Sequence, residues 1–587
     1  MPLVLFHTRR VREALKQPEA WGADIFFLLL IAALVGALLT MARQIGAPYQ
    51  PKLEISLSLW ALPKYTMLSL SRGFAAYVLS LIFTLVYGSI AAHNRRAEKV
   101  MVPALDVLQS IPVLGFLPGL VLAMIGLFPT REIGLEIACI VMIFTAQAWN
   151  MTFSLYASIR SIPQTMREVA TMNNLSRWRI FRLLELPASM IGLVWNSMMS
   201  MAGGWFFLSV NEAFTLGDKD FRLPGIGSYM SEAINQDNNG AKVAAIVAMI
   251  VMIVAVDQLF WRPIVVWSER FKMEETADAD KAQSWVLDLL QHSRLWHWLL
   301  QRLMPRSDPV AANPVPASFE RGPIPLSYQL RPPQQRQNSR AAIMWTVVAL
   351  LGALAVWGGW SITRLLIELP AHGWVSAILA LAASFGRTSA AVVLGAAWAL
   401  PAGILIGLSP RWSQRVQPFV QVLASFPAPM LFPMVTIALV ALKVPFTIGC
   451  VTLMLLGTQW YILFNVIAGA MAIPGELKEV ARLYRTSRVQ RWLRLYIPGV
   501  FPYLITGMIT AAGGAWNATI VSEYVQMKDQ TYSAFGLGSL ISQATARGDF
   551  PLLAAGIVIM AFSVVLLNRL IWRRLYRLAE ERYSLTM

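Results

Sequence analysis

The stretch Glu168–Pro187 reads EVATMNNLSRWRIFRLLELP, and the stretch Glu479–Pro498 reads EVARLYRTSRVQRWLRLYIP. Both segments are basic, and each lies between two apolar runs. A proline precedes each stretch, an acid opens it and arginines follow, which is the order that favours helix formation. The pattern predicts a short helix, a turn and a second basic helix leading into the next apolar run. One copy would be explained equally well by an interfacial anchor, whereas two copies favour a symmetric docking surface.

The composition indicates a membrane protein with several spans. Of the 587 residues, 56% are hydrophobic and only 14% are charged, far from the balance of a soluble domain. The net charge of +17 comes from short basic runs at the ends of apolar segments, so it reflects membrane topology rather than nucleic-acid binding. Cys139 and Cys450 lie inside apolar segments, and we expect neither a disulfide framework nor a metal site.

The apolar runs predict an all-α fold of about twelve transmembrane helices. Backbone polar groups cannot remain unpaired in lipid, and the alternating pattern of an outer-membrane barrel is missing from the sequence. No cleavage pattern follows the first run, which we expect to stay as an anchor. The predicted spans are 24–42, 74–92, 103–127, 134–157, 188–211, 242–262, 341–363, 385–408, 418–442, 445–471, 499–521 and 551–572.

An internal duplication organises these spans. Adding 311 to a first-half position reaches the same residue type many times, and upstream the offset becomes 315 because the first copy carries four extra residues near FPTREIGL. Six spans is an even number, so the two copies insert with the same orientation, as parallel repeats about an axis along the membrane normal with a pathway between them. The pairs include Cys139 and Cys450, Trp149 and Trp460, Glu168 and Glu479, Pro187 and Pro498, Trp205 and Trp516, Glu212 and Glu523, Gly225 and Gly536, and, at 315, Pro112 and Pro427.

The predicted domain organisation follows from the repeat. Residues 1–70 form an N-terminal segment with the first span, 71–272 the first repeated domain, 273–340 an amphipathic and then proline-rich linker, 341–384 the seventh span with an outer loop, and 385–587 the second repeated domain. The positive-inside rule places the loops richest in Lys and Arg in the cytoplasm. In this topology both termini and both quoted segments are cytoplasmic. The loop 43–72 fits that rule least well.

The quoted segments resemble the EAA loop of the permease subunits of binding-protein-dependent ABC importers. The matching positions in the first copy are Glu168, Ala170, Asn174 and Pro187, and in the second copy they are Glu479, Ala481, Arg485 and Pro498. The copies depart from the family pattern at the middle alanine, which is valine in both, and at the usual glycine, which is Asn174 or Arg485. Arg tolerates a left-handed turn poorly, so the shape of the second turn is open.

Further stretches are similar to the nitrate, sulfonate and taurine branch of those permeases. They are LQSIPVLGFLPGLVLAMIGLF and LASFPAPMLFPMVTIALVAL, and the Gly-x-Gly segments LPGIGSYMSEAI and FGLGSLISQA. The resemblance implies a type I importer permease in a bacterial inner membrane, coupled to two copies of a separate ATP-binding subunit and supplied by an extracytoplasmic binding protein. It also implies a small oxyanion or organic acid as solute, such as nitrate, a sulfonate or bicarbonate.

The chain itself is not expected to be an enzyme. No Gly-Lys dipeptide occurs, which excludes a P-loop, and no HExxH, GxSxG or His/Cys cluster appears. We therefore expect no cofactor or metal in this chain, with ATP and Mg²⁺ bound by the partner subunit. An ion-coupled twelve-helix carrier is the rival hypothesis, but it usually needs ionisable residues at mid-membrane, and the predicted spans hold few.

Several polar and aromatic residues in or near the spans are candidates for the pathway. Glu212 and Glu523 are either a charged pair near its outer mouth or helix-end contacts, and Trp205 and Trp516 either line it or pack. Asparagines inside spans need partners or water. The full set is Asn150, Asn196, Trp205, Glu212, Asn465, Trp516, Asn517 and Glu523.

Overall fold

The computed structural model describes residues 53–110, 112–129, 132–173, 175–216, 219–271, 284–292, 356–527 and 530–583, and the single positions 25, 28, 29 and 353. It divides into two compact units. The described part of one unit is mainly α13 (Trp285–His292) and a helix over 356–368. The other unit holds both halves of the duplication. Most of the predicted spans 24–42 and 341–363 and of the predicted linker 273–340 lie outside the described residues.

The first half is almost entirely helical. Its elements in chain order are α3 (Leu62–His93), α4 (Arg95–Ser110), the 3₁₀ helix η1 (Val113–Phe116), α5 (Leu117–Leu127), α6 (Ile133–Ser161), α7 (Gln164–Met172), α8 (Arg177–Ile180), the π-helix η2 (Phe181–Glu185), α9 (Leu186–Asn211), strands β1 (Ala213–Leu216) and β2 (Lys219–Arg222), α10 (Ile226–Asn235), α11 (Asn239–Val256), the π-helix η3 (Asp257–Trp261), α12 (Arg262–Ser268) and the 3₁₀ helix η4 (Glu269–Phe271).

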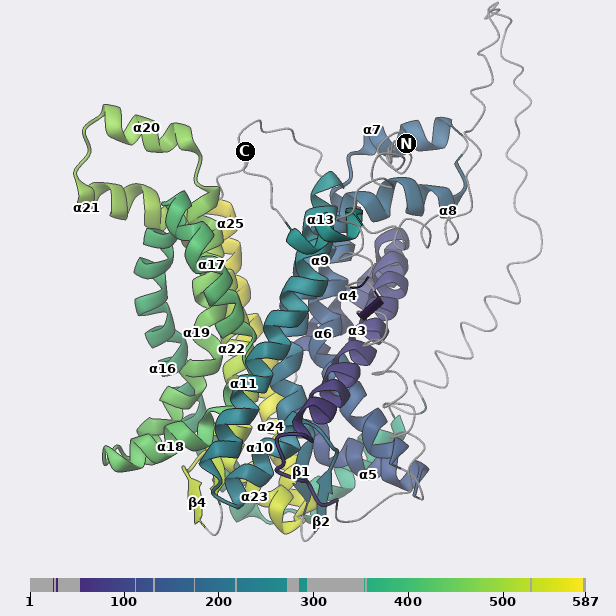
Figure 1. Cartoon of the computed structure of the whole chain (residues 1–587), viewed down its shortest axis with the longest axis vertical. Coiled ribbons are helices and arrows are strands. Elements are labelled where there is room, and N and C mark those ends of the chain that lie inside the picture. The colour runs from purple at the N-terminus through teal and green to yellow at the C-terminus, as the bar shows by residue number, and fades with distance from the viewer. Residues whose placement is uncertain are drawn as a thin grey trace, which may run out of the picture. The chain divides into compact units, whose positions relative to one another are not determined.

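The second half repeats this order (Figure 1), except that α25 covers the positions equivalent to both α12 and η4. Its elements are α16 (Ala371–Gly407), α17 (Pro410–Ser425), η5 (Ala428–Met430), α18 (Phe432–Ala441), α19 (Phe446–Ala472), α20 (Gly475–Leu483), α21 (Arg488–Arg491), the π-helix η6 (Trp492–Tyr496), α22 (Ile497–Ser522), strands β3 (Tyr524–Met527) and β4 (Gln530–Ser533), α23 (Leu537–Arg547), α24 (Phe550–Leu567), the π-helix η7 (Asn568–Trp572) and α25 (Arg573–Tyr583).

The all-α polytopic prediction is confirmed. Among the described residues, seven helices are long and apolar enough to cross a membrane, and they carry the predicted second, fourth, sixth, eighth, tenth, eleventh and twelfth spans. The predicted fifth span, 188–211, is the 26-residue helix α9, in which Asn196 and several serines lower the hydropathy. Two elements were not predicted, the antiparallel hairpins β1–β2 and β3–β4.

The predicted third and ninth spans are each broken into two helices. The span 103–127 separates into α4 and η1–α5 at Pro112, and the span 418–442 into α17 and η5–α18 at Pro427. Proline disfavours the helical conformation of the residue before it and cannot donate a backbone hydrogen bond. Each apolar run was predicted as one continuous span, and the structure corrects that prediction at these two prolines.

Prolines also explain local changes of helix type. Pro187 and Pro498 lie in the first turns of α9 and α22 and follow the π-helices η2 and η6. A proline has no N–H for the carbonyl four residues earlier, so the helix widens by one residue before it. The π-helix η3 likewise precedes Pro263, whereas η7 has no proline after it, and nothing in the structure explains its shape.

The two halves pack together by reciprocal contacts. Helix α4 contacts α24 while α17 contacts α11, and η1 contacts α22 while η5 contacts α9. A single hydrophobic core continues across the boundary, since Met198 and Trp205 of the first half cluster with Met430, Trp516 and Met560 of the second. The exchange of equivalent contacts agrees with parallel repeats related by a pseudo-twofold axis.

Candidate functional site

Two helical hairpins lie at one end of the unit, and the two β-hairpins lie at the other (Figure 1). The first helical hairpin is α7 followed by α8 and η2, and the second is α20 followed by α21 and η6. These hairpins contain the two repeated basic segments that resemble the EAA loop, and they form as the sequence predicted, a short helix, a turn and a second basic helix. We call them the first and second coupling hairpins, after the role that the resemblance implies.

The turn of the second coupling hairpin is left-handed at Arg485, whose φ is +46°. The N–H of Thr486 donates back to the carbonyl of Ala481 at 3.2 Å, which closes the end of α20. In the first coupling hairpin the N–H of Leu175 makes the equivalent 3.2 Å bond to Ala170. The turn is therefore retained although Arg replaces the usual glycine. Asn174 lies outside the described residues.

A serine begins the second helix of each coupling hairpin. The hydroxyl of Ser176 accepts from the N–H of Arg179, and the hydroxyl of Ser487 accepts from the N–H of Gln490. In the second hairpin the side chain of Gln490 also accepts from the N–H of Ser487 at 2.9 Å, completing a capping box. These caps fix where α8 and α21 start.

Exposed apolar side chains occupy equivalent places on both coupling hairpins. Val169 pairs with Val480, and Met172, 81% exposed, pairs with Leu483, 80% exposed. Glu168 and Glu479 are also exposed, whereas Ala170 is buried beneath the first turn. Large apolar residues exposed at the same two positions of both copies are typical of surfaces that contact a protein partner or a membrane interface.

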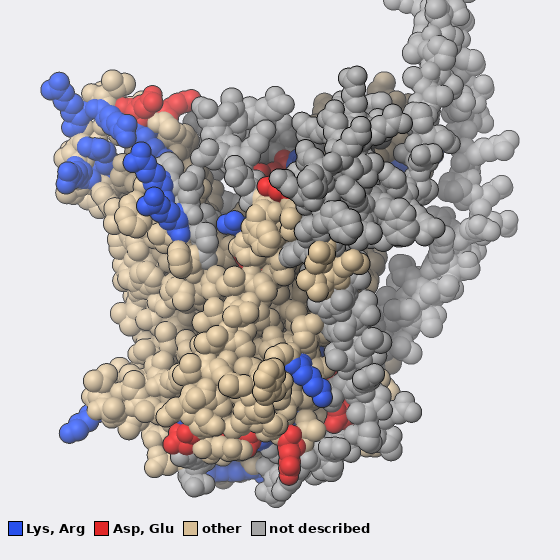
Figure 2. Space-filling model, in the orientation of Figure 1, with Lys and Arg blue, Asp and Glu red and all other residues tan. Residues whose placement is uncertain are grey.

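Basic residues surround the second coupling hairpin. Figure 2 shows Lys and Arg gathered at its end of the molecule, separated from the charges at the opposite end by a broad band without charge. The arginines of this segment are Arg482, Arg485, Arg488, Arg491 and Arg494. The pKa of the Lys478 ammonium is lowered, mainly by burial and secondly by the positive charge of the neighbouring Arg482. The charge-free band agrees with a membrane-spanning belt.

A buried ionic cluster holds the first half together at the other end. The guanidinium of Arg72 donates to Glu136 at 2.6 and 2.7 Å and to Glu212 at 2.7 Å. Glu212 also accepts from the hydroxyl of Ser69 at 2.6 Å and from the N–H of Gly227 at 2.8 Å. The cluster joins α3, α6 and α9 to the start of α10, where an anionic group is favoured.

The second half contains the equivalent cluster with one acid fewer. Arg387 donates to Glu523 at 2.8 Å, and Glu523 accepts from Ser384 at 2.8 Å and from the N–H of Gly538 at 3.0 Å. Thr447 occupies the position equivalent to Glu136, and only its backbone carbonyl accepts from Arg387, at 3.2 Å. The first cluster thus has two carboxylates for one guanidinium, and the second has one.

The Gly-x-Gly segments let these carboxylates reach the backbone. A Cβ on Gly225 would lie 2.3 Å from the carboxylate of Glu212, and a Cβ on Gly536 would lie 2.3 Å from that of Glu523. The structure therefore accounts for the acids and the glycines within each half. A pathway role for Glu212 and Glu523 stays a prediction.

The cationic partners of these acids, Arg72 and Arg387, were not among the residues predicted from the sequence. Arg72 lies just before a predicted span and Arg387 lies inside one, and the offset of 315 relates them. An arginine pair at equivalent positions of two apolar segments would have been a usable signal, because a charge there requires a partner. The serines Ser69 and Ser384 are related by the same offset.

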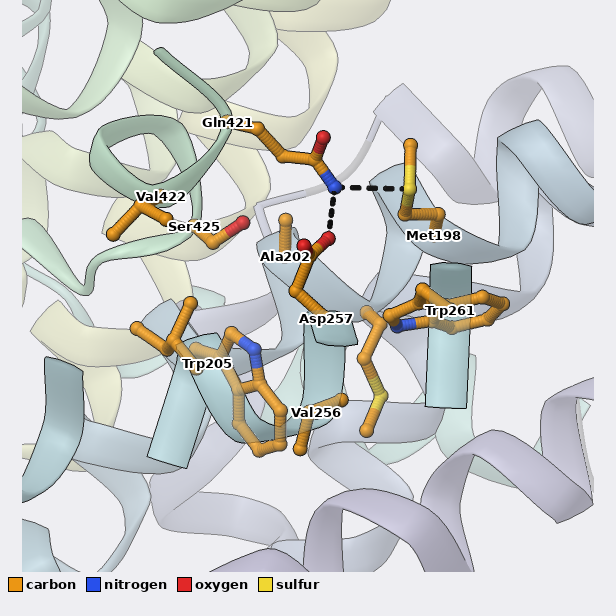
Figure 3. Close-up of a pocket in the computed structure, with 11 residues that line it drawn as sticks. Met198, Ala202, Trp205, Val256, Asp257, Trp261, Gln421, Val422 and Ser425 are labelled. Carbon is orange, nitrogen blue, oxygen red and sulfur yellow. Dashed lines mark hydrogen bonds between the residues drawn. The ribbon is translucent and has the colours of Figure 1, made fainter. Parts of the chain in front are cut away.

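One polar contact at the boundary between the halves joins α17 to the π-helix η3. The amide of Gln421 donates to Asp257 at 2.5 Å and contacts the sulfur of Met198 at 3.0 Å (Figure 3). A second amide, that of Gln258, donates to Asp257 at 2.9 Å. Beside this contact is a cavity of about 20 Å³ that Trp205 also lines, too small for a solute larger than water.

The equivalent boundary contact is chemically different. Asp106 of α4 occupies the position equivalent to Gln421 and forms an ion pair with Arg573, which is equivalent to Arg262. Asn568 occupies the position equivalent to Asp257. The two related contacts between the halves therefore use an amide with a carboxylate on one side and a guanidinium with a carboxylate on the other.

A larger cavity of about 300 Å³ lies between the halves, next to the β-hairpins. We call it the inter-half cavity. Equivalent residues line it from both sides, among them Leu114 and Pro429, Pro118 and Pro433, Val210 and Val521, and Ala213 and Tyr524. Helices α5 and α18 both start at this cavity, so the partial positive charge of two helix starts is close to it.

The predicted pathway residues do not form one cluster. Asn517 joins the halves, since its side-chain oxygen accepts from the N–H of Val113 at 2.8 Å. Asn196 and Asn465 donate to carbonyls of their own helices at 3.0 and 2.8 Å. The exposed Asn150 lies on α6, and Trp205 and Trp516 are buried in the shared core. A Cβ on Gly73 would lie 2.7 Å from the Trp205 ring, which shows how closely that ring packs.

Comparison with known proteins is consistent with this architecture. The nitrate import permease protein NrtB of Leptolyngbya laminosa is 28% identical over 191 residues, 32% of this chain and 65% of that protein. The bicarbonate transport system permease protein CmpB of Synechocystis is 33% identical over 143 residues, 24% of this chain and 50% of that protein. A probable ABC transporter permease of Brucella melitensis is 23% identical over 230 residues, 39% of this chain and 87% of that protein. The chain thus spans about half to two thirds of the length of the first two relatives.

The family match is broader than these pairwise matches and occurs twice. The model of the binding-protein-dependent transport system inner membrane component matches residues 84–260 and again residues 399–584, one match in each half. Together the two matches cover more than half of the chain. The chain is therefore a multi-pass membrane protein that belongs to the family of binding-protein-dependent transport system inner membrane components.

Proposed function

We propose that this chain is the complete translocation core of an ABC importer for a small oxyanion, with nitrate or bicarbonate as the first candidates. The permeases NrtB and CmpB are named for those solutes. The two halves of this chain supply the two permease domains that such a core needs. One copy of the chain would then serve two copies of a separate cytoplasmic ATP-binding subunit and one extracytoplasmic binding protein.

The observation that carries the coupling role is the repeated exposed apolar pair. Val169 and Met172 on the first coupling hairpin correspond to Val480 and Leu483 on the second. The proposal places both hairpins and both termini in the cytoplasm, where each hairpin docks in a groove of one ATP-binding subunit. ATP and Mg²⁺ would be bound by that subunit, and its closure would move the two halves relative to each other.

The test uses proteoliposomes containing the chain, a candidate ATP-binding subunit and the binding protein. The double variant Met172→Asp, Leu483→Asp should no longer associate with the ATP-binding subunit, and its ATP-driven uptake should fall more than about tenfold. The reason is that both new carboxylates would be removed from water and placed beside apolar atoms of the partner. Leu442→Asp is the control, since Leu442 is similarly exposed but lies directly after α18, away from the coupling hairpins.

Two outcomes would refute the proposal. Unchanged association and uptake in the double variant would show that the coupling hairpins are not the docking sites. Uptake without any ATP-binding subunit, abolished when an ion gradient is collapsed, would instead identify an ion-coupled carrier.

A further inference from the structure

We infer that the inter-half cavity holds the solute during its passage as a singly charged anion, and that the second half alone supplies the side-chain hydrogen-bond donors. This inference rests on the proposed function for the identity of the solute. The cavity is the larger of the two described here and is built by both halves. A volume of about 300 Å³ accommodates an oxyanion of a few atoms together with water.

The polar lining of the inter-half cavity is one-sided. The first half contributes Leu114, Leu117, Pro118, Val210, Ala213 and Phe214, which are all apolar. The second half contributes Tyr524, Gln526, Ser542 and Thr545 in addition to apolar residues. At one of the equivalent places a tyrosine, Tyr524, therefore lines the cavity where the first half has only the small side chain of Ala213.

Two of those four side chains have a donor left for a solute. The hydroxyl of Ser542 already donates to the carbonyl of Ile520 at 2.6 Å, and that of Thr545 donates to Ile541 at 2.8 Å. Within the described part of the chain, neither the hydroxyl of Tyr524 nor the amide of Gln526 makes a side-chain hydrogen bond. Tyr524 and Gln526 lie two residues apart on β3.

The charge of the lining restricts the class of solute. No Lys, Arg, His, Asp or Glu is among the described residues that line the cavity. Neutral N–H and O–H donors can stabilise one delocalised negative charge, whereas the cost of removing a multiply charged anion from water is much larger. The cavity thus favours a monoanion such as nitrate or bicarbonate over a dianion such as sulfate.

The direct test introduces a charge of either sign at position 526, where the native glutamine is neutral. Gln526→Glu has nearly the same shape and should lower ATP-driven nitrate uptake more than about tenfold, because a carboxylate within several ångströms repels the anion. Gln526→Lys should keep uptake at or above the wild-type rate. Tyr524→Phe, which removes only the hydroxyl, should lower uptake about two- to tenfold.

Matched controls come from outside the cavity. Gln530→Glu places the same charge on β4 of the same hairpin, where Gln530 is exposed and does not line the cavity. Tyr583→Phe removes a hydroxyl from a ring that packs against Phe501, far along the chain on α25. Both variants should transport nitrate as the wild type does.

The results separate clearly. Wild-type uptake in both Gln526→Glu and Gln526→Lys would show that the anion does not pass this cavity, and equal loss in both would assign Gln526 to packing. Either result overturns the inference while ATP-driven uptake by the wild type still supports the proposed function. Greater uptake in Gln526→Glu than in Gln526→Lys would indicate a cation and overturn it too.

A second readout does not require transport. Cys139 and Cys450 are buried, whereas position 526 is exposed. The variant Gln526→Cys therefore has an accessible thiol whose labelling can be followed in the purified chain. Nitrate should slow that labelling and sulfate at equal ionic strength should not. Protection by nitrate without ATP-driven uptake would retain the cavity and refute the coupling proposal, and no protection by nitrate would refute the cavity.

Discussion

The guanidinium of Arg72 lies 2.7 Å from the carboxylate of Glu212, and both side chains are buried. At the equivalent place in the second half, Arg387 lies 2.8 Å from Glu523. The first pair joins the end of α9 to α3 and to the start of α10. The second pair joins the end of α22 to α16 and to the start of α23. The difference is the second acid, Glu136, which only the first pair has.

Arg72→Met should therefore destabilise the protein more than Arg387→Met. Removing Arg72 leaves two carboxylates without their buried counter-charge, and breaking a buried pair costs about 3–5 kcal/mol. Removing Arg387 leaves one, and Arg387 is itself partly exposed. The measurement is the free energy of unfolding in detergent, or the thermal midpoint if unfolding is irreversible. Equal losses in the two variants would contradict the role given to Glu136.

Gly225→Ala should be strongly destabilising, because the new Cβ would lie 2.3 Å from the Glu212 carboxylate that the start of α10 binds. The carboxylate would have to leave its hydrogen bonds, each worth about 1.5–3 kcal/mol for a charged acceptor. Gly119→Ala is the control, since nothing lies within 4 Å of a Cβ added in α5, and it should stabilise that helix by up to about 1 kcal/mol. The thermal midpoints should move in opposite directions.

Arg485→Gly should stabilise the second coupling hairpin. Arg485 has a φ of +46°, a conformation that costs an ordinary residue about 1–2 kcal/mol and glycine almost nothing. Part of that gain is offset by the larger entropy of glycine in the unfolded chain. Hydrogen exchange of the amides of α20 and α21 measures the effect locally, where slower exchange is expected. Arg488→Gly, inside α21, should have the opposite effect, and faster exchange in Arg485→Gly would contradict the strain argument.

A double-mutant cycle should show coupling between Gln421 and Asp257. Gln421→Leu removes one of the two amide donors to a carboxylate at the boundary between the halves and should cost about 1–3 kcal/mol. In an Asp257→Asn background the same change should cost less, because no charge is left underpaired. Additive effects on the thermal midpoint would show that the contact contributes little to holding the halves together.

Much of this architecture was available from the sequence. The offsets of 311 and 315 and the length of the apolar runs predicted two parallel, all-helical repeats, and both the fold and the family match agree with them. The breaks at Pro112 and Pro427 were predictable in principle, because proline disfavours an uninterrupted helix, yet composition alone gave continuous apolar runs. Hydropathy indicates whether a segment lies in an apolar environment, and it says little about whether the segment forms one unbroken helix.

The site was less predictable, for physical reasons. The left-handed conformation of Arg485 depends on hydrogen bonds from Thr486 and on the cap at Ser487, which outweigh the poor intrinsic preference of arginine. Tyr524 and Gln526 are ordinary strand residues in the sequence, and only the packing of α5, α18 and α23 turns them toward one cavity. The tertiary fold decides which polar groups share a space.

The difference between the equivalent residues Tyr524 and Ala213 also bears on why the two halves are joined in one chain. In a dimer of identical subunits every substitution appears twice, so a hydroxyl added on one wall of a central chamber is necessarily added on the other. A covalently fused pair is free of that constraint, and each wall can change by itself. A small planar anion has no need of two identical walls. If the proposed anion passes through this cavity, fusion allows the two walls to differ and the cavity to fit the anion.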